Sequence, residues 1–329
     1  LNKVISPISG VFKNIEEKKV NGVKCKCLVI QNDFKEKEKT VGRRKSISLE
    51  KDAIVSKLYE HYFKYIASIL ESKKINHLVI SSIEDEPYIA NNSYILNKFT
   101  KEILEMADIL STSFKIENTL IAIKSSDTQN VEKYLSKIGT YPNISLSLIE
   151  DKYLLGKSFF LMEYLELKDL DTLVIDANTL LQMYNAIKYG KNTTETFITI
   201  AGPSLEKSKV IKVKIGSLLS DVIENNVKLK VKDSKYILNG LLTGFECNPN
   251  QEIVGINTLG VIVILNEEEK SLECNNCGLC AKICPVSVNP KNVMDKKKIS
   301  NSCLDCGLCT YICHCHINLR KFLRGETNE

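Results

Sequence analysis

The sequence is poor in histidine, with only four in the whole chain: His61, His77, His314 and His316. It contains no H-x-x-H pair, no nucleophile-elbow pattern and no recognisable Ser-His-Asp set. Those arrangements carry metal-dependent and serine hydrolysis. We therefore expect neither hydrolytic chemistry nor histidine-based acid–base catalysis.

An excess of one charge and long apolar runs are also missing. The 45 basic and 40 acidic residues are interspersed and give a net charge of only +5, which predicts no nucleic-acid partner. Every apolar run ends before the roughly 18 residues of a membrane span, and the first residues lack a signal-peptide pattern. We expect a cytoplasmic protein, with peripheral association at the cytoplasmic face of a membrane through partners as an option.

Cysteine, in contrast, is concentrated near the C-terminus. Eight cysteines form two runs with the spacing C-x2-C-x2-C-x3-C: Cys274, Cys277, Cys280 and Cys284, then Cys303, Cys306, Cys309 and Cys313. In this spacing three thiolates of one run hold a [4Fe–4S] cluster, while the fourth goes to the neighbouring cluster. The predicted sets are Cys274, Cys277, Cys280 and Cys313 for one cluster, and Cys284, Cys303, Cys306 and Cys309 for the other.

Two structural zinc sites are the alternative interpretation, because C-x2-C pairs also suit tetrahedral zinc. Zinc takes four ligands in two pairs, whereas this chain repeats a run of four. The repeat therefore favours clusters. Such cysteines need reduced thiols, which agrees with a cytoplasmic and anaerobic or protected setting.

The two runs share one feature and differ in another. Gly278 and Gly307 each follow the second cysteine of a run, where a residue without Cβ lets backbone N–H groups approach the sulfurs. Pro285 follows the first run, but the second ends in residues 313–316, Cys-His-Cys-His. Cys315 or a histidine could replace a ligand there; the interpretation we favour is solvated histidines and a spare thiol.

Hydrophobic periodicity predicts an α/β segment followed by an α+β segment. Buried strands are expected at 77–80, 119–123, 144–149 and 172–175, and helices at 53–72, 95–110, 131–138 and 179–189. This alternation indicates a Rossmann-like parallel sheet. Strands at 196–202, 209–214 and 260–264 with one helix at 218–224 then suggest a module of β-grasp type.

Three cysteines lie outside the two runs. Cys25 and Cys27 share one face of a predicted strand, and we interpret them as small core hydrophobes. Cys247 lies in a predicted turn, and a redox or partner-linked thiol is conceivable there, although a lone loop cysteine usually has neither role.

Several segments, in the same order, resemble the RnfC family, a subunit of the Rnf electron-transport complex that is itself similar to the flavin-binding subunit of complex I. Residues 6–11 resemble its barrel-sandwich motif, and residues 83–89 its Gly-Ala-Glu-Cys-Glu-Pro-Tyr-Ile motif, with Asp85 in place of cysteine. Residues 211–223 and 257–263 resemble its SLBB β-grasp signature. The two cysteine runs complete the family order.

The resemblance implies four parts: a barrel-sandwich element (1–45), a Rossmann-like domain (46–194), an SLBB β-grasp module (195–268) and a dicluster ferredoxin module (269–329). We expect the last to be helical, because residues 286–301 show no alternating strand pattern.

By resemblance, Glu84, Asp85 and Glu86 lie beside a flavin ring, which makes them the candidate cofactor-binding residues for FMN and NADH. The chain departs from the family in one respect: it lacks the glycine-rich loop before this motif, and no glycine occurs between Gly42 and Glu84. Without that loop the usual nest of N–H groups for a phosphate cannot form in the family's way. FMN and NADH thus stay open; residues 42–45, Gly-Arg-Arg-Lys, are an alternative phosphate contact, and a solvated acidic turn is the alternative for Glu84, Asp85 and Glu86.

The function predicted from sequence is an iron–sulfur electron-transfer subunit of an oxidoreductase. It would pass single electrons between a donor, either NADH through a flavin or a ferredoxin, and a membrane or soluble reductase partner. The alternative is a degenerate RnfC-like binding or assembly module with structural clusters and no flavin or NADH chemistry.

Overall fold

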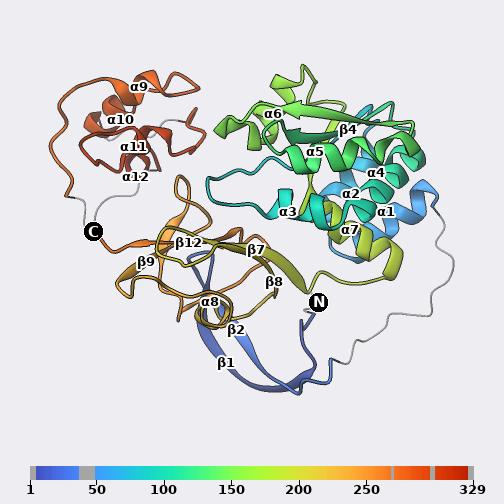
Figure 1. Ribbon diagram of the computed structural model, residues 1–329, viewed down its shortest axis with the longest axis horizontal. Helices are drawn as coiled ribbons and strands as arrows, with labels where there is room; N and C mark the ends of the chain where they lie inside the picture. The colour runs from blue at the N-terminus through green and yellow to red at the C-terminus, as the bar shows by residue number, and fades with distance from the viewer. Residues whose placement is uncertain (1–4, 37–48, 268–269, 297–300, 325–329) are drawn as a thin grey trace.

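The computed structural model describes residues 5–36, 49–267, 270–296 and 301–324. Figure 1 shows three groups of elements: a helix-covered sheet, a β-rich part that includes the N-terminal strands, and a small helical part with the cysteine runs. The basic residues Arg43, Arg44 and Lys45, considered above as a phosphate contact, lie outside the described residues.

The helix-covered sheet is parallel and has the strand order β5-β4-β3-β6. Its strands are β3 (His77–Ser81), β4 (Asn118–Lys124), β5 (Ile144–Ile149) and β6 (Thr172–Asp176). Leu78 and Ile80 pack into one core and Val79 into a second core on the opposite face. Strands buried on both faces are nearly continuous hydrophobic runs, so the sequence could predict them. The expected parallel α/β sheet is confirmed.

Helices cover both faces of this sheet (Figure 1). They are α1 (Lys51–Glu60), α2 (Lys64–Ser72), α3 (Asn91–Lys98), α4 (Thr100–Phe114), α5 (Thr128–Leu135), α6 (Ser158–Tyr164) and α7 (Ala177–Tyr189), with 3-10 turns η1 (Ile138–Thr140) and η2 (Tyr153–Gly156). Gly190 ends α7 in the left-handed conformation with φ 63°, as its position after the periodic residues predicted.

The predicted helices over 53–72 and 95–110 are wrong in their continuity. The first is broken between α1 and α2, where Tyr62 has a φ of 70° and the buried His61 ring lies 2.9 Å from Oδ1 of Asn192. The second is broken between α3 and α4 at Phe99, whose ring packs edge-on against Phe197. Both breaks accompany contacts with residues far along the chain, so local periodicity could not reveal them.

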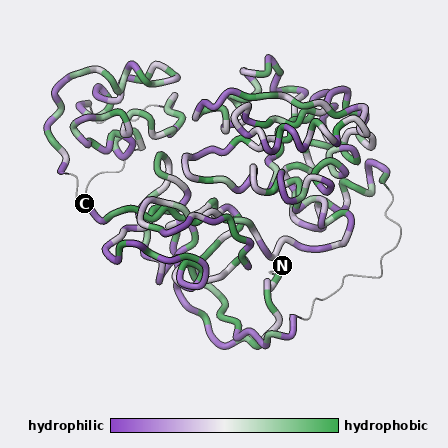
Figure 2. Tube along the Cα trace, viewed as in Figure 1, coloured by the Kyte–Doolittle hydropathy of each residue, from purple (hydrophilic) through white to green (hydrophobic). Residues whose placement is uncertain are grey.

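The β-rich part contains a five-stranded sheet with the order β10-β9-β12-β7-β8. Its strands are β7 (Glu195–Ala201), β8 (Lys209–Lys214), β9 (Ser234–Leu238), β10 (Phe245–Cys247) and β12 (Gly260–Leu265). Helix α8 (Leu219–Asn226) places Leu219, Val222 and Ile223 in the core of this sheet. Green and purple stretches alternate along the chain in Figure 2, as expected where each element buries one face.

The N-terminal strands form a hairpin, β1 (Gly10–Val20) and β2 (Val23–Asn32), and β1 also pairs with β11 (Glu252–Ile253). The first and third predicted parts of the chain therefore share a sheet. Cys25 and Cys27 are half-buried on β2 instead of lying in the core, because much of this hairpin is exposed. Our interpretation of these two cysteines as core residues is wrong.

The C-terminal part is helical where it is described, in residues 270–296 and 301–324. Its helices are α9 (Leu279–Lys282), α10 (Pro290–Lys296), α11 (Leu308–Tyr311) and α12 (Leu319–Arg324). Six buried residues form its core, and six of the eight cluster cysteines are among the partly buried residues around that core or within it. None of the helices in the described ranges is long and apolar enough to cross a membrane.

Candidate functional site

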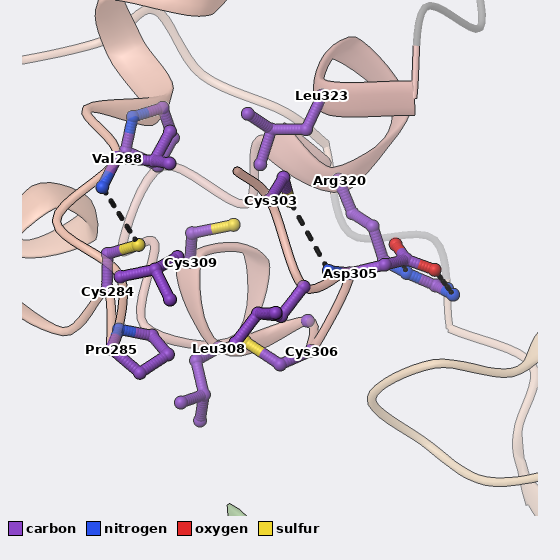
Figure 3. Close-up of a pocket in the computed structure, with 14 residues that line it drawn as sticks. Cys284, Pro285, Val288, Cys303, Asp305, Cys306, Leu308, Cys309, Arg320 and Leu323 are labelled. Carbon is purple, nitrogen blue, oxygen red and sulfur yellow. Dashed lines mark hydrogen bonds and ion pairs between the residues drawn. The ribbon is translucent and has the colours of Figure 1, made fainter. Parts of the chain in front are cut away.

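Four cysteines line one pocket in the C-terminal part, and they are the set predicted for one cluster. Cys284 comes from the first run, whereas Cys303, Cys306 and Cys309 come from the second (Figure 3). The empty volume between the lining residues is about 380 Å³, part of it open to solvent. The remaining wall is mostly apolar and includes Pro285, Val286, Val288, Leu308 and Leu323.

Local backbone geometry directs these cysteines toward the pocket. Gly307, with φ 79°, begins α11, so Cys306 lies just before this short helix and Cys309 in its first turn. The N–H of Val288 donates to Sγ of Cys284 at 3.3 Å, and the N–H of Asp305 donates to Sγ of Cys303 at 3.4 Å. Backbone dipoles aimed at sulfur stabilise a thiolate and tune a bound cluster.

Burial raises the pKa of the Cys306 thiol, and the nearby Cys284 and Cys303 raise it further. Burial also raises the pKa of Cys309 to about 11, with Cys306 and Cys303 adding to the effect. These mutual effects place the four thiols close enough to influence one another. A bound cation would be needed to keep such thiols ionised together.

The other predicted set is less enclosed. Cys274, Cys280 and Cys313 pack beside the same small core, whereas Cys277 is exposed. Across the described parts of the chain, no three His, Cys, Asp or Glu side chains are grouped as metal ligands. The structure thus brings one set of four around a pocket and leaves the second set more open.

The residues after the second run lie as our preferred interpretation expected. His314 and His316 are exposed, and Cys315 is buried in the core with 7% exposure. The carbonyl oxygen of Cys315 accepts a hydrogen bond from the N–H of Leu272 at 2.9 Å. Cys315 thereby fastens the start of the first run to the end of the second.

The acidic motif follows β3 at the carboxyl edge of the parallel sheet, beside the end of β6, where the strand order changes direction. Ligands of open α/β sheets bind at such a switch point. Here Oε1 of Glu84 accepts hydrogen bonds from the N–H groups of Asn92 at 2.5 Å and Ser93 at 3.3 Å, which begin α3. A carboxylate at a helix N-terminus satisfies donors that have no partner within the helix.

Burial raises the pKa of Glu84 to about 7, and the charges of Asp176 and Asp85 contribute in the same direction. The hydrogen bonds from Asn92 and Ser93 lower it but do not compensate for the burial. Glu84 is therefore a carboxyl that changes its charge near neutral pH.

This pKa predicts a stability change with pH. In the unfolded chain the Glu84 pKa is near 4.5, so between that value and 7 the folded state holds a proton that the unfolded state has lost. The contribution is present in full below pH 4.5 and is lost as pH rises through 7, by about 3 kcal/mol for such a shift. Denaturant unfolding from about pH 5.5 to 8 should show this loss in the native protein and not in Glu84→Gln; equal slopes would contradict it.

Asp85 and Glu86 are also used within the chain. Asp85 forms an ion pair with Lys157, with 3.5 Å between Oδ2 and Nζ. Glu86 is buried and accepts hydrogen bonds from the N–H groups of Leu242 at 2.9 Å and Thr243 at 3.0 Å, and from the Thr243 hydroxyl. The solvated-turn alternative for this motif is therefore wrong, because its acids connect elements of the fold.

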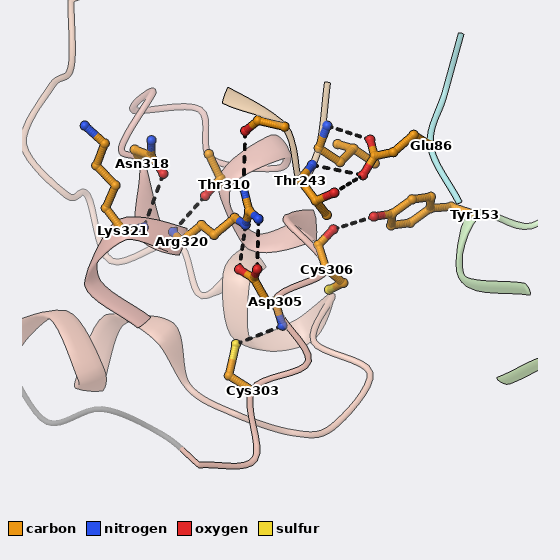
Figure 4. Close-up of polar contacts among 12 residues, drawn as sticks. Glu86, Tyr153, Thr243, Cys303, Asp305, Cys306, Thr310, Asn318, Arg320 and Lys321 are labelled. Carbon is orange, nitrogen blue, oxygen red and sulfur yellow. Dashed lines mark hydrogen bonds and ion pairs between the residues drawn. The ribbon is translucent and has the colours of Figure 1, made fainter. Parts of the chain in front are cut away.

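Residues that the sequence did not single out join the pocket to the rest of the chain (Figure 4). The Tyr153 hydroxyl in η2 donates to the carbonyl oxygen of Cys306 at 2.7 Å. Arg320 in α12 forms a bidentate ion pair with Asp305, with distances of 2.5 and 2.8 Å, and contacts the carbonyl oxygen of Gly244 at 3.4 Å. No local sequence signal marks either residue, because their partners lie far away in sequence or follow from the three-dimensional packing.

The parallel sheet and the cysteine runs define an electron-transport protein of the class built on a flavin-subunit fold. The family model of the Nuo51 FMN-binding domain matches residues 59–200. The chain is also similar to crystal structures of an NAD+-reducing [NiFe]-hydrogenase, with a TM-score of 0.59 and 10% identity in the air-oxidized state, over 85% of this chain and 61% of that one. For the H2-reduced state the TM-score is 0.55 and the identity 11%, over 84% of this chain and 60% of that one. At these identities the structures show the shared fold only.

Within this class the chain belongs to the RnfC family, as its motifs predicted. It is 27% identical over 242 residues to the RnfC-type component of the ion-translocating oxidoreductase complex of Buchnera aphidicola, covering 69% of this chain and 48% of that protein. It is 22% identical over 240 residues to the corresponding component of the Na(+)-translocating ferredoxin:NAD(+) oxidoreductase complex of Acetobacterium woodii, covering 69% and 54%. The chain spans about half the length of these relatives.

Proposed function

We propose that this chain is an electron-transfer subunit that carries two [4Fe–4S] clusters, one in each predicted cysteine set. The observation that carries the proposal is the pocket in which Cys284 of the first run joins Cys303, Cys306 and Cys309 of the second. Crossed ligation of this kind is the expectation for the spacing of the two runs, whereas zinc sites built from single runs would not need it.

A [4Fe–4S] cluster supplies one-electron chemistry without proton transfer. The chain's own residues would hold the sulfur ligands, and Val288, Leu308 and Leu323 would exclude water from the pocket. The N–H groups of Val288 and Asp305 would stabilise negative charge on Cys284 and Cys303. Cys274, Cys277, Cys280 and Cys313 would hold the second cluster by the same ligation.

We propose a donor and an acceptor by class. The donor is NADH through a flavin, or a reduced ferredoxin, and the acceptor is a membrane or soluble reductase partner. The name of the Acetobacterium woodii relative joins ferredoxin and NAD(+) in one complex, which supports these classes. The partners would be other subunits of an electron-transport complex, and any membrane association would be peripheral and pass through them.

The acidic motif does not by itself form a flavin cradle. Glu84 satisfies the first N–H groups of α3, Glu86 holds residues 242–243, and the sequence before β3 provides no glycine-rich nest. We therefore assign the redox chemistry of the proposal to the cysteines alone. FMN binding, which the domain match raises, is left as an outcome of the experiment.

We also propose the finer division of the fold. The helix α8 packed on a mixed sheet supports an SLBB β-grasp module over residues 195–268. The hairpin β1–β2 supports a barrel-sandwich element within residues 1–45, and the remaining parts are a Rossmann-like domain over 46–194 and a dicluster module over 269–329.

The test is an anaerobic one: the chain is reconstituted with iron and sulfide, released flavin is assayed, and NADH and then a low-potential chemical reductant are added. We expect the reductant to bleach the visible iron–sulfur absorbance reversibly. Stoichiometric flavin with bleaching by NADH would identify an NADH-linked entry site, and its absence would identify a relay that depends on partners. Iron that cannot be reduced would contradict electron transfer and support the alternative, an assembly module with structural clusters.

A further inference from the structure

The two cysteine runs contain the same turn, Cys-Gly-Leu-Cys, in nearly the same conformation. Gly278 begins α9 with φ 75°, and Gly307 begins α11 with φ 79°. Both turns place a cluster cysteine directly before the glycine, Cys277 in one case and Cys306 in the other. The two turns are therefore matched copies, and any difference between them comes from their surroundings.

The turn of the second run is covered by the rest of the chain. Gly307 is buried, and a Cβ on it would lie 2.2 Å from the carbonyl oxygen of Leu242. The Tyr153 hydroxyl reaches the carbonyl oxygen of Cys306 from the helix-covered sheet. This turn consequently faces both the β-rich part and the carboxyl edge of the parallel sheet.

Further contacts fix that arrangement. Arg320, with 9% exposure, is paired with Asp305 and contacts the carbonyl oxygen of Gly244. The loop it contacts is held in turn by Glu86 through Leu242 and Thr243. The cysteine set with Cys306 is thus anchored to the part of the fold that resembles a flavin subunit.

The turn of the first run is open. A Cβ on Gly278 would meet nothing within 4 Å. Cys277 is the only one of the twelve cysteines that is exposed. The residues around it are of mixed character, with the apolar Leu272 and Ile283 exposed to 60% and 40% and the charged Glu273 and Lys282 also exposed. Small mixed surfaces of this kind are typical of transient contacts between redox proteins.

We infer that the two sets are consecutive relays: the set with Cys306 is the inner one, and the turn at Cys277 and Gly278 is the docking surface for an electron-carrying partner protein. The inference rests on the proposed function. The occupant follows from the comparison of the two turns, since the copy at Gly307 already forms an interface with the chain. One electron leaves the cluster at Cys277, which is oxidised, and reduces a one-electron centre of the partner; no atoms are transferred.

The docking surface is tested by a charge change at its rim, Leu272→Glu with Lys282→Glu, against the control Leu170→Glu, an exposed residue of the segment between α6 and β6. The reconstituted proteins are reduced chemically and oxidised in single turnovers by a ferredoxin with two [4Fe–4S] clusters, or by ferricyanide. We expect the double variant to slow oxidation by the ferredoxin about tenfold, with ferricyanide unaffected and the control unchanged. Equal rates with the ferredoxin would overturn the inference.

A second readout does not depend on a partner. Gly278→Ala and Gly307→Ala carry the same backbone cost, because both glycines lie in the left-handed region, with φ of 75° and 79°. We expect only Gly307→Ala to lower the thermal unfolding midpoint by several degrees, since only that Cβ meets backbone. A soluble paramagnetic chelate should broaden the cluster signal that Cys274→Ser removes and spare the other, whereas equal broadening would contradict the inner and outer order. Failure to form reducible clusters would instead contradict the proposed function.

Discussion

Replacing Cys284 with serine removes the cluster of the second run, although Cys284 belongs to the first. The side chain of Cys284 lines the pocket of Cys303, Cys306 and Cys309, so its loss leaves that set with three thiols. Iron per reconstituted chain should fall from about eight to about four. The remaining electron paramagnetic resonance signal of Cys284→Ser should match that of Cys303→Ser and differ from that of Cys274→Ser.

Cys315→Ser is the matched control for this experiment. Cys315 is buried in the same small core but does not line the pocket. Its replacement should leave the iron content and both signals in place. If Cys284→Ser instead resembles Cys274→Ser, each run holds its own cluster and the crossed assignment is wrong.

Glu86→Ala should have the largest effect on stability among the acidic residues at the sheet edge. The carboxylate of Glu86 is 3% exposed and accepts hydrogen bonds from Leu242 and Thr243. Its removal leaves buried N–H groups without a partner, which should lower the free energy of unfolding by about 3 kcal/mol. Denaturant unfolding measures this change.

The control is Glu163→Ala, because Glu163 is exposed and its removal should change the free energy of unfolding by less than about 0.5 kcal/mol. Thr243→Val should reproduce part of the Glu86 effect, since it removes only the hydroxyl donor. Equal stabilities of Glu86→Ala and Glu163→Ala would show that the contact between the sheet edge and the 242–243 loop is unimportant.

The parts of the fold that were predictable from sequence are those encoded by local patterns. The four strands of the parallel sheet are hydrophobic on both faces, and Gly190 marks the end of α7. The cysteine set around Cys284 followed from spacing alone, because cluster ligation imposes that spacing on the chain. Such features depend on neighbours within a few residues.

The parts that were not predictable depend on contacts between distant residues. The break at Tyr62 accompanies the contact of His61 with Asn192, and the junction at Cys306 depends on Tyr153, which is 153 residues away. Likewise, three consecutive acids looked like a solvated turn or a flavin neighbour. Only the packing of α3 and of the 242–243 loop reveals that Glu84 and Glu86 point into the structure.

The central claim, two redox-active clusters in one small helical module, is tested most directly by metal and sulfide analysis combined with electron paramagnetic resonance of the reduced chain. The account predicts about eight iron and eight sulfide per chain, and two signals that interact because their ligands share one core. Zinc bound by the same cysteines, with no signal after reduction, would contradict it.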